Sequence, residues 1–446
     1  MTCSLFHPGL LLIFSGLLIP FIHGFKRTLF ILIIPCLSLL SVWSMPFGSD
    51  CSIQYLDYEL ILINLDLLSR LFITVFAITV FTVGLFCCKQ ASSTELSAAY
   101  VYAGGAMSVV LAGDLISLFI FWELMALAST LVIWSAQNEK SYKAGMRYIS
   151  IHLLGGVILM CGIASYVYET NSIAFTHMQL NSISTWLILC GFLLNAGAPP
   201  LTAWLADAYP EASYSGMVFL SAFTTKTAVY VLLRGFPGTE LLIYIGLFMI
   251  FYGIIYALLE NDIRRILAYS IINQVGFMVC GIGIGTEMAL NGTAAHAFTH
   301  IIYKALLLMS AGSVLYMTGK RKCTELGGLV QSMPLTAICG IVGALAISSF
   351  PLTSGFISKS MITQASIDEH VLWVWLLLQA ASAGVFLHAG IKFPWFVFFQ
   401  KDSGLRPTDP PINMKISMVF FAVICILIGI FPNILYNILP YNVNYQ

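Results

Sequence analysis

The chain has 446 residues, of which 59% are hydrophobic and 9% are charged. Soluble domains carry about 25% charged residues, so a soluble protein of this length would lack the charge to cover its surface. A mean hydropathy of +0.91 indicates a polytopic membrane protein instead. The formal net charge of +0 excludes nucleic-acid binding driven by bulk charge, so we expect no nucleic-acid partner.

The eleven cysteines are scattered, and no two of them form a C-x-x-C pair. Zinc and iron–sulfur ligation needs clustered thiolates, so we expect no metal site and interpret the cysteines as small apolar fillers. The sequence contains no Walker motif and no haem-ligand pattern, and we expect no bound cofactor.

Apolar runs long enough to cross a bilayer follow one another along the whole chain. Since backbone groups in lipid must be hydrogen-bonded within the span, such runs favour helices. We predict an all-α polytopic membrane protein with about fourteen transmembrane helices of roughly 20 residues each. The candidate spans are, in chain order, 8–24, 28–46, 61–87, 96–113, 115–136, 147–168, 184–203, 214–234, 241–259, 265–285, 289–317, 333–364, 371–393 and 414–436.

These spans fall into four groups. Residues 1–95 hold helices 1–3, residues 96–234 helices 4–8, residues 241–393 helices 9–13, and residues 414–446 helix 14. The first run has no basic residue before it, so we interpret it as a membrane span and not as a cleaved signal peptide.

Helix-breaking residues occur in the seventh and twelfth spans. Proline lacks a backbone donor and glycine eases unusual dihedral angles, so we expect broken helices near 193–210 and 348–362. Both segments contain the string P-L-T, at 200–202 and at 351–353, and they lie five spans apart. Because five is odd, the two five-helix units would enter the membrane in opposite senses, which is typical of an inverted-repeat transporter.

The basic residues set the orientation. Fifteen of the twenty Lys and Arg residues fall in alternate connections if the N-terminus is outside, and only Arg70 and Arg234 lie toward the other side. This bias follows the positive-inside rule. We therefore expect a multi-pass protein of the cell (inner) membrane with both termini on the non-cytoplasmic side.

Several charged groups remain inside the predicted spans. Glu123 lies eight residues into its span, Lys226 lies twelve residues into another, and Lys359 follows the break at Gly355. Each charge at mid-bilayer costs about 2.5–3.5 kcal/mol on insertion scales. We interpret these residues as part of a proton-translocation pathway.

The richest pattern is a stripe of three ionisable residues on one predicted helix. His296, His300 and Lys304 are spaced at i, i+4 and i+8, which places them on one face. Two imidazoles and an amine in an otherwise apolar helix indicate a proton relay. His152 and His388 have no such companions, and we expect structural roles for them.

Four segments together carry a family resemblance. They are FWELM around Glu123, NDIRRILAYSIINQVGFM at 261–278, HAFTHIIYKALLLMSAG at 296–312 and FPLTSGFISKS at 350–360. They resemble the antiporter-like subunits of respiratory complex I and of Mrp-type multisubunit cation/proton antiporters, over residues 60–365 and more loosely to the end. WLADAYP at 204–210 and FTTK at 223–226 are most similar to the D-type subunit of Mrp antiporters.

The resemblance implies a fold of fourteen helices with two inverted five-helix repeats and broken helices seven and twelve. It also implies roles. Glu123 matches the glutamate that controls proton entry, and Lys226 matches the lysine that links the half-channels. Lys304, with its neighbouring histidines, matches the centre of the second half, and Lys359 matches the lysine at the exit.

One position departs from the family pattern. The family places a lysine nine residues before the tryptophan that matches Trp204, and this chain has Asn195 there; Ala206 replaces the usual proline. The Glu–Lys pair in which one charge shifts the pKa of the other is therefore absent in its usual form. Either Glu123 uses Lys226 as its partner through water, or the first half-channel is degraded.

Three functional hypotheses follow. The first is a secondary-transporter subunit and not an enzyme, Mrp-like, that couples H⁺ movement to a Na⁺ or K⁺ gradient. Its partners would be the other membrane subunits of the assembly. The second is a proton-pumping subunit of an NADH–quinone oxidoreductase or hydrogenase membrane arm, whose electron chemistry would belong to partner subunits. The third is a transport-inactive scaffold, for which Asn195 is the best evidence.

Overall fold

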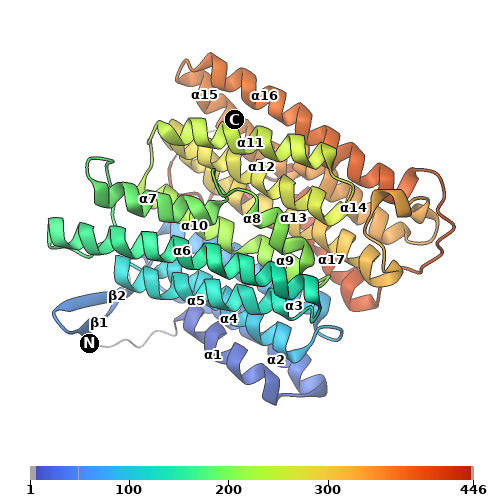
Figure 1. Ribbon diagram of the computed structural model, residues 1–446, viewed down its shortest axis with the longest axis horizontal. Helices are drawn as coiled ribbons and strands as arrows, with labels where there is room; N and C mark the ends of the chain where they lie inside the picture. Colours follow the sequence, from blue (N-terminus) through green and yellow to red (C-terminus); the bar gives the residue numbers. More distant parts are fainter. Residues whose placement is uncertain (1–6, 49, 443–446) are drawn as a thin grey trace.

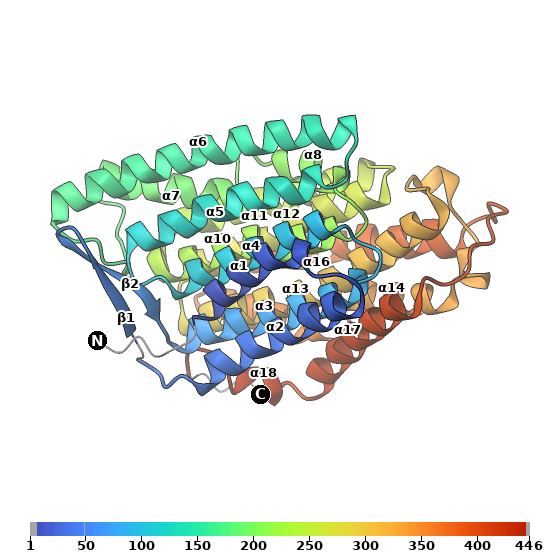
Figure 2. The same cartoon turned by 90° about the horizontal axis from the view of Figure 1, so that it is seen from below.

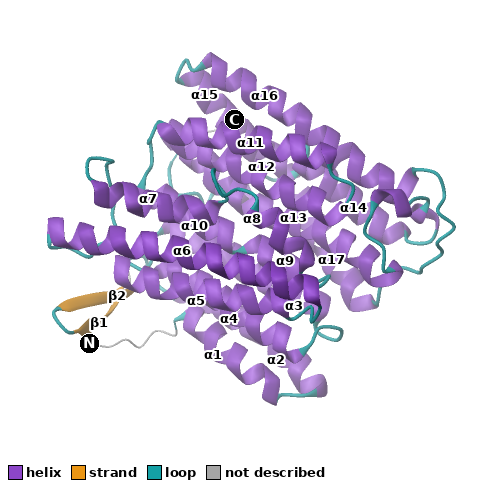
Figure 3. Cartoon of the chain, viewed as in Figure 1, coloured by secondary structure: helices purple, strands orange, loops and turns teal. Residues whose placement is uncertain are grey.

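The computed structural model describes residues 7–48 and 50–442. Most of these residues are helical, and the helices lie side by side, roughly along the longest dimension of the molecule (Figure 1; Figure 3). A two-stranded hairpin extends from one end of the bundle, on the left in Figure 1. Figure 2 shows α6 along one flank and α2 and α17 toward the opposite flank.

The N-terminal region departs from the all-α prediction because it contains the hairpin. The predicted span at 61–87 is wrong at its start, since residues 61–64 pair in the sheet. Asp66 then caps a new helix by accepting a hydrogen bond from the Ser69 backbone N–H at 2.8 Å. Cys51 in the hairpin is disulfide-bonded, so it is not the filler that we expected. The elements are α1 (Pro8–Leu18), η1 (Ile19–Phe21), α2 (Gly24–Ser44), β1 (Asp50–Tyr55), β2 (Tyr58–Asn64) and α3 (Leu67–Cys87).

Two of the helix interruptions between residues 183 and 235 lie near residues that the sequence analysis singles out. Helix α7 ends at Ala196, where Gly197 adopts a left-handed φ of 78°, and the chain becomes helical again at Trp204. This interruption falls within 193–210, where the sequence predicts a break. A second one separates α9 from α10 at Phe223, and the sequence does not predict it. The elements are α4 (Ser93–Leu111), α5 (Leu115–Trp134), α6 (Glu139–Thr170), α7 (Ile183–Ala196), α8 (Trp204–Ala208), η2 (Tyr209–Glu211), α9 (Gly216–Ala222) and α10 (Thr224–Gly235).

A third interruption separates α14 from α15 at residues 348–353, within the range 348–362 where the sequence predicts a break. A Cβ added to Gly355 would lie 1.9 Å from the carbonyl oxygen of Ala346, so only glycine lets α15 begin this close to the end of α14. Residues 386–399 wind largely as π-helix. The elements are α11 (Leu241–Leu259), α12 (Ile263–Ile284), α13 (Glu287–Thr318), η3 (Cys323–Glu325), η4 (Leu329–Gln331), α14 (Pro334–Ile347), α15 (Ser354–Asp368), α16 (Leu372–Val385), η5 (Phe386–Lys392), η6 (Trp395–Phe399), α17 (Ile412–Ile430) and α18 (Asn433–Tyr436).

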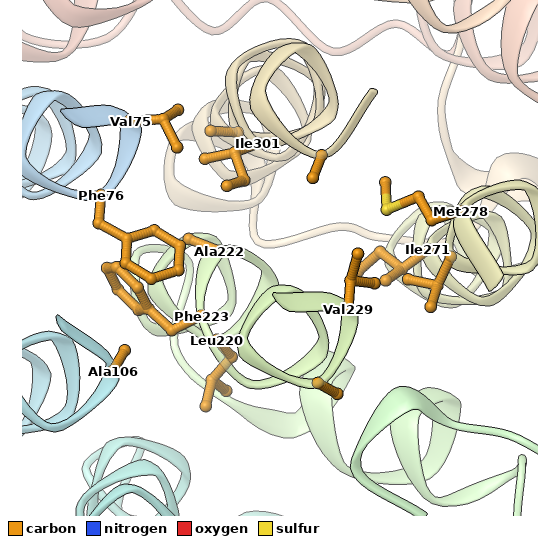
Figure 4. Close-up of a cluster of buried hydrophobic side chains, with 14 of the residues drawn as sticks. Val75, Phe76, Ala106, Leu220, Ala222, Phe223, Val229, Ile271, Met278 and Ile301 are labelled. Carbon is orange, nitrogen blue, oxygen red and sulfur yellow. The ribbon is translucent and has the colours of Figure 1, made fainter. Parts of the chain in front are cut away.

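Helix α13 lies in the middle of the bundle and packs against α3, α9, α10, α12, α14, α15 and α17 (Figure 1). Figure 4 shows the apolar side chains at the junction of α9 and α10. Phe76 of α3 and Tyr102 of α4 each meet Phe223 edge to face, with ring centroids 5.2 and 5.1 Å apart. Aromatic side chains of α3 and α4 therefore pack against the second interruption.

Ten helices of the described residues are long and apolar enough to cross a membrane by length and composition. Three shorter apolar helices lie at Pro8–Phe21, Ile183–Ala196 and Pro334–Ile347. The prediction of a mostly helical polytopic membrane protein is confirmed. The count of fourteen spans and the two inverted repeats stay predictions.

Candidate functional site

The candidate site is built around the buried face of α13. His296, His300 and Lys304 are each 0% exposed, as the helical spacing predicts for residues on one inward face. His296 is held on both ring nitrogens. Its Nδ1 lies 2.9 Å from Ser358 Oγ on α15, and its Nε2 lies 3.1 Å from Gln274 Oε1 on α12.

His300 and Lys304 differ from His296 because they lack partners. Both ring nitrogens of His300 and Nζ of Lys304 are buried and form no hydrogen bond with the residues that the structure describes. Lys304 nevertheless lies close enough to Lys226 and Lys359 for their charges to interact, and His300 interacts with all three lysines. The bundle therefore brings the predicted residues of α10, α13 and α15 into one electrostatically connected group.

Lys226 lies at the interruption between α9 and α10. Its Nζ donates to the carbonyl oxygen of Ser221 at 2.6 Å and to Thr225 Oγ1 at 3.1 Å. Ser221 belongs to the last turn of α9, and the end of a helix carries unpaired carbonyl groups with partial negative charge. The lysine thus binds the end of the preceding helix.

Lys359 repeats this arrangement at the break between α14 and α15. Its Nζ donates to the carbonyl oxygen of Ile347, the last residue of α14, at 2.8 Å. The same Nζ lies 4.8 Å from the ring centroid of Phe277, a cation–π distance. A helix end and an aromatic face therefore stabilise an ammonium group that is only 2% exposed.

Glu123 lies apart from these lysines. Its side chain is half-buried between α5 and α6, with Oε1 directed at Gly156 and without a hydrogen-bond partner. Among the residues that the structure describes, Glu123 forms no ion pair within 4.0 Å. Asn195, at the last turn of α7, neighbours the imidazole of His152. A link from Glu123 to Lys226 through water, and a contact of Asn195 with Glu123, stay predictions.

An arginine cluster fixes the segment that follows the first break. Arg264 at the start of α12 is 2% exposed and donates to three backbone carbonyl groups, those of Pro210, Ala212 and Ser213, at 2.7–2.9 Å. Arg321, in the loop after α13, pairs with Glu211 at 2.7 Å. Burial acts to lower the pKa of Arg321. Its ion pairs with Glu211 and Asp262 outweigh this effect, so the pKa of Arg321 is raised.

Sequence reasoning missed the polar residues that hold the stripe. Gln274 accepts from the hydroxyl of Tyr303 at 3.0 Å and contacts His296, and Ser358 bonds to both His296 and Thr299. The available signal was the polar pair at 273–274 inside an otherwise apolar span. No cluster of three metal-ligating side chains occurs within the described part of the chain.

Comparisons with known proteins agree with the resemblance inferred from the motifs. The family described as "NADH:quinone oxidoreductase/Mrp antiporter, TM" matches residues 112–385. The chain is 30% identical over 417 residues to the D-type subunit of the Na(+)/H(+) antiporter of Alkalihalophilus pseudofirmus, and the match covers 86% of this chain and 79% of that relative.

Two solved structures share the fold. The Mrp complex from Dietzia sp. contains a chain that superposes with a TM-score of 0.85 at 20% identity, covering 97% of this chain and 95% of that one. Respiratory complex I from Thermus thermophilus contains a chain with a TM-score of 0.85 at 20% identity, covering 97% of both chains. The resemblance that the four sequence segments predicted is confirmed.

Proposed function

Since the chain belongs to the NADH:quinone oxidoreductase/Mrp antiporter transmembrane family, we propose that it serves as the D-type subunit of an Mrp-like antiporter complex. In this role it exchanges H⁺ for a monovalent cation, Na⁺ or K⁺, together with other membrane subunits. It is a secondary-transporter subunit and carries out no chemical conversion of its own.

The observation that carries this proposal is the buried group of Lys226, His300, Lys304 and Lys359 on three packed helices. Like charges that interact in a buried site lower one another's proton affinity. A proton that binds one amine therefore favours release from the next, and titration of the group is shared among its members. Glu123, on α5, supplies the entry group, and Lys359, at the second break, supplies the exit.

The orientation is part of the proposal. Counting α4 and the three shorter apolar helices with the ten long ones gives about fourteen spans, if α7 and α14 cross the membrane together with the helical segments that follow their breaks. The asymmetry of Lys and Arg favours an orientation with the hairpin outside the cytoplasm. The disulfide bond of Cys51 supports this side, because disulfides persist in oxidising compartments. The terminal residues 1–6 and 443–446, for which we expect the same side, lie outside the described residues.

Replacing Lys304 tests the proposal. Lys304→Ala removes the central amine, which has no hydrogen-bond partner whose loss would destabilise the fold. We expect the complex to purify intact while membrane vesicles lose their pH-gradient response to Na⁺ and K⁺. Lys320→Ala, in the loop after α13 where the side chain is exposed, is the matched control and should transport normally. Transport retained in Lys304→Ala would favour the scaffold hypothesis.

A second candidate function is a proton-pumping subunit of a redox complex. The fold shared with a chain of respiratory complex I favours it. The two functions differ in their partners. Purification of the complex with an affinity tag on this chain, followed by mass spectrometry, should identify small membrane subunits in the first case. Flavin- or iron–sulfur-binding subunits would support the second.

A further inference from the structure

We propose that His152 is the proton-carrying group at the first helix break, in place of the lysine that Asn195 replaces, and that buried hydroxyl groups connect it to the helix of Lys226. This inference rests on the proposed function. The sequence alone suggests a structural role for His152, because no ionisable residue accompanies it on its helix face. The structure supplies companions from other helices.

His152 lies on α6 and faces the interruption between α7 and α8. Its ring centroid is 4.1 Å from that of Tyr148 and 4.6 Å from that of Trp204, the first residue of α8. Asn195 of α7 neighbours the same imidazole. His152 is 2% exposed, and its Nε2 has no hydrogen-bond partner among residues 7–48 and 50–442. Burying a nitrogen without a hydrogen bond costs about 1–3 kcal/mol. A purely structural role for His152 would not offset this cost.

Hydroxyl groups from five elements gather beyond Tyr148. The hydroxyls of Ser129 on α5 and Tyr148 on α6 lie 2.9 Å apart, and those of Tyr102 on α4 and Thr224 on α10 lie 2.6 Å apart. Tyr209 of η2 has a buried, unpartnered hydroxyl and neighbours Tyr102, Tyr148 and Thr224. All five side chains are at most 2% exposed. Tyr209 therefore connects the two hydrogen-bonded pairs into one cluster.

The pathway begins near Glu123 and ends near Lys226, two groups that the proposed function uses. Glu123 lies against Gly156, one helical turn from His152 on α6. Thr224 stands two residues before Lys226 on α10. The order Glu123, His152, hydroxyl cluster and Lys226 thus spans the first unit without a lysine on α7.

The transfer conserves protons at every step. The carboxyl group of Glu123 gives its proton to one nitrogen of His152, and the imidazolium releases the proton on the other nitrogen to the hydroxyl cluster. Each hydroxyl accepts a proton on its oxygen and passes its own onward, with water carrying the proton where the groups do not touch. The amine of Lys226 takes the last proton, and the imidazole returns to its neutral form.

The decisive experiment combines His152→Gln with Asn195→Lys in the intact complex. Glutamine keeps a polar side chain of similar size but binds no proton. We expect His152→Gln to slow transport at least tenfold per assembled complex, in line with the rate contribution of a positioned proton carrier. The double variant should recover transport, because a lysine then faces the same break. A loss that Asn195→Lys does not reverse, or no loss in His152→Gln, overturns the proposal.

The pH profile gives a readout that a structural role would not change. An amine holds its proton more tightly than an imidazole, with unperturbed pKa values of about 10.4 and 6.5. The double variant should therefore work best at higher pH than the wild type. The titratable groups near His152 are Tyr148 on its own helix, Tyr209 beside Tyr148, and Glu123 against the next turn. The profile of Glu123→Gln separates the contribution of that carboxyl group.

A tyrosine pair tests the hydroxyl cluster with a matched control. Tyr148→Phe removes the hydroxyl that bonds to Ser129 and leaves the ring against His152. Tyr100→Phe removes an equally buried hydroxyl that bonds only to the backbone of Ile31. We expect at least a tenfold slower transport in the first variant and a normal rate in the second. Equal rates in the two variants exclude the cluster as a proton path.

The failure of this inference and the failure of the proposed function have different signatures. If Lys304→Ala abolishes transport while His152→Gln and Tyr148→Phe transport normally, the chain translocates ions without His152. If Lys304→Ala transports normally, the proposed function itself fails.

Discussion

The carboxyl group of Glu123 fits against α6 because Gly156 has no side chain. A Cβ added to Gly156 would lie 2.1 Å from Oε1 of Glu123, so the carboxyl group rests directly against the backbone of α6. No cation of the described residues pairs with it. The shape of α6, and not a charged partner, therefore holds the entry group in position.

Gly156→Ala should displace this carboxyl group. We expect transport to slow about tenfold or more, because misplacing a reacting group by an ångström can cost up to about 100-fold in rate. The complex should still assemble, since alanine in a helix is favoured over glycine by about 1 kcal/mol. The measurement is the transport rate of vesicles, normalised to the amount of assembled complex.

Gly105→Ala on α4 is the matched control for this variant. Its added Cβ would meet the flexible side chain of Met125 on α5 at 3.1 Å, and that side chain can adjust. Transport should be normal. An equal loss in both variants would assign the effect of Gly156→Ala to general packing of α5 and not to the carboxyl group.

At the scale of the elements, Arg264 ties the start of α12 to η2 and the residues that follow it. Arg264 binds the backbone through the carbonyl groups of Pro210, Ala212 and Ser213. These carbonyls lie in the segment after α8, where the guanidinium group supplies the donors that a continuous helix would otherwise provide. A charge-assisted contact of this kind is worth about 1.5–3 kcal/mol, more than a neutral hydrogen bond.

Arg264→Ala should therefore destabilise the complex by about 3 kcal/mol or more, because it leaves several buried carbonyl groups unpaired. Arg265→Ala, at the next position, should cost about 1 kcal/mol or less, since its pair with Glu260 is partly exposed. Thermal denaturation of the two purified complexes compares these effects. Equal midpoints would show that the three backbone contacts add little to stability.

How much of each element the sequence predicts depends on the residue that ends it. Proline and glycine mark the breaks near Pro200 and Gly355, and both interruptions occur there. The interruption at Phe223 carries neither; Phe223 packs edge to face against Phe76 and Tyr102, which lie far from it in the sequence, and no local pattern reveals these contacts. The hairpin escapes prediction because YELILIN at 58–64 is apolar enough to merge with the following span.

In the candidate site, too, the sequence predicts what lies on one element but not contacts between elements. The stripe on α13 is predictable, because its three residues share one helix and a period of four. The role that we propose for His152 is not, because the groups that give it chemical meaning come from α5, α7, α8 and η2. The sequence orders those groups along the chain, but only the packed bundle places Tyr148, Trp204 and Asn195 around one imidazole.

The whole molecule has two unlike ends. The hairpin and the connection from α6 to α7 lie together, since the N–H of Gly113 donates to Ile61 in the hairpin at 2.9 Å and the N–H of Phe175 donates to Gly113 at 3.1 Å. The loop from η6 to α17, with Lys401 and Arg406, lies at the opposite end in Figure 1. We expect these ends to face opposite sides of the membrane.

Cysteine reporters test this orientation. Gln179→Cys places a thiol in the connection between α6 and α7, and Lys401→Cys places one in the loop before α17; both positions are exposed. A membrane-impermeant maleimide should label Gln179→Cys in intact cells and Lys401→Cys only after the cells are opened. The unsubstituted chain measures background from its native thiols. The reverse pattern would invert the proposed topology.

The acceptors of Lys226 and Lys359 have a consequence for how this protein tolerates mutation. The Nζ atoms of both lysines donate to main-chain oxygen atoms, of Ser221 and Ile347, and every amino acid provides that atom. Substitutions at positions 221 and 347 therefore leave the acceptor in place, provided that the new side chain fits, because both side chains are buried. Selection then acts on side-chain size at these two positions, and at Gly355 on the absence of a side chain, since a Cβ there would meet the carbonyl oxygen of Ala346.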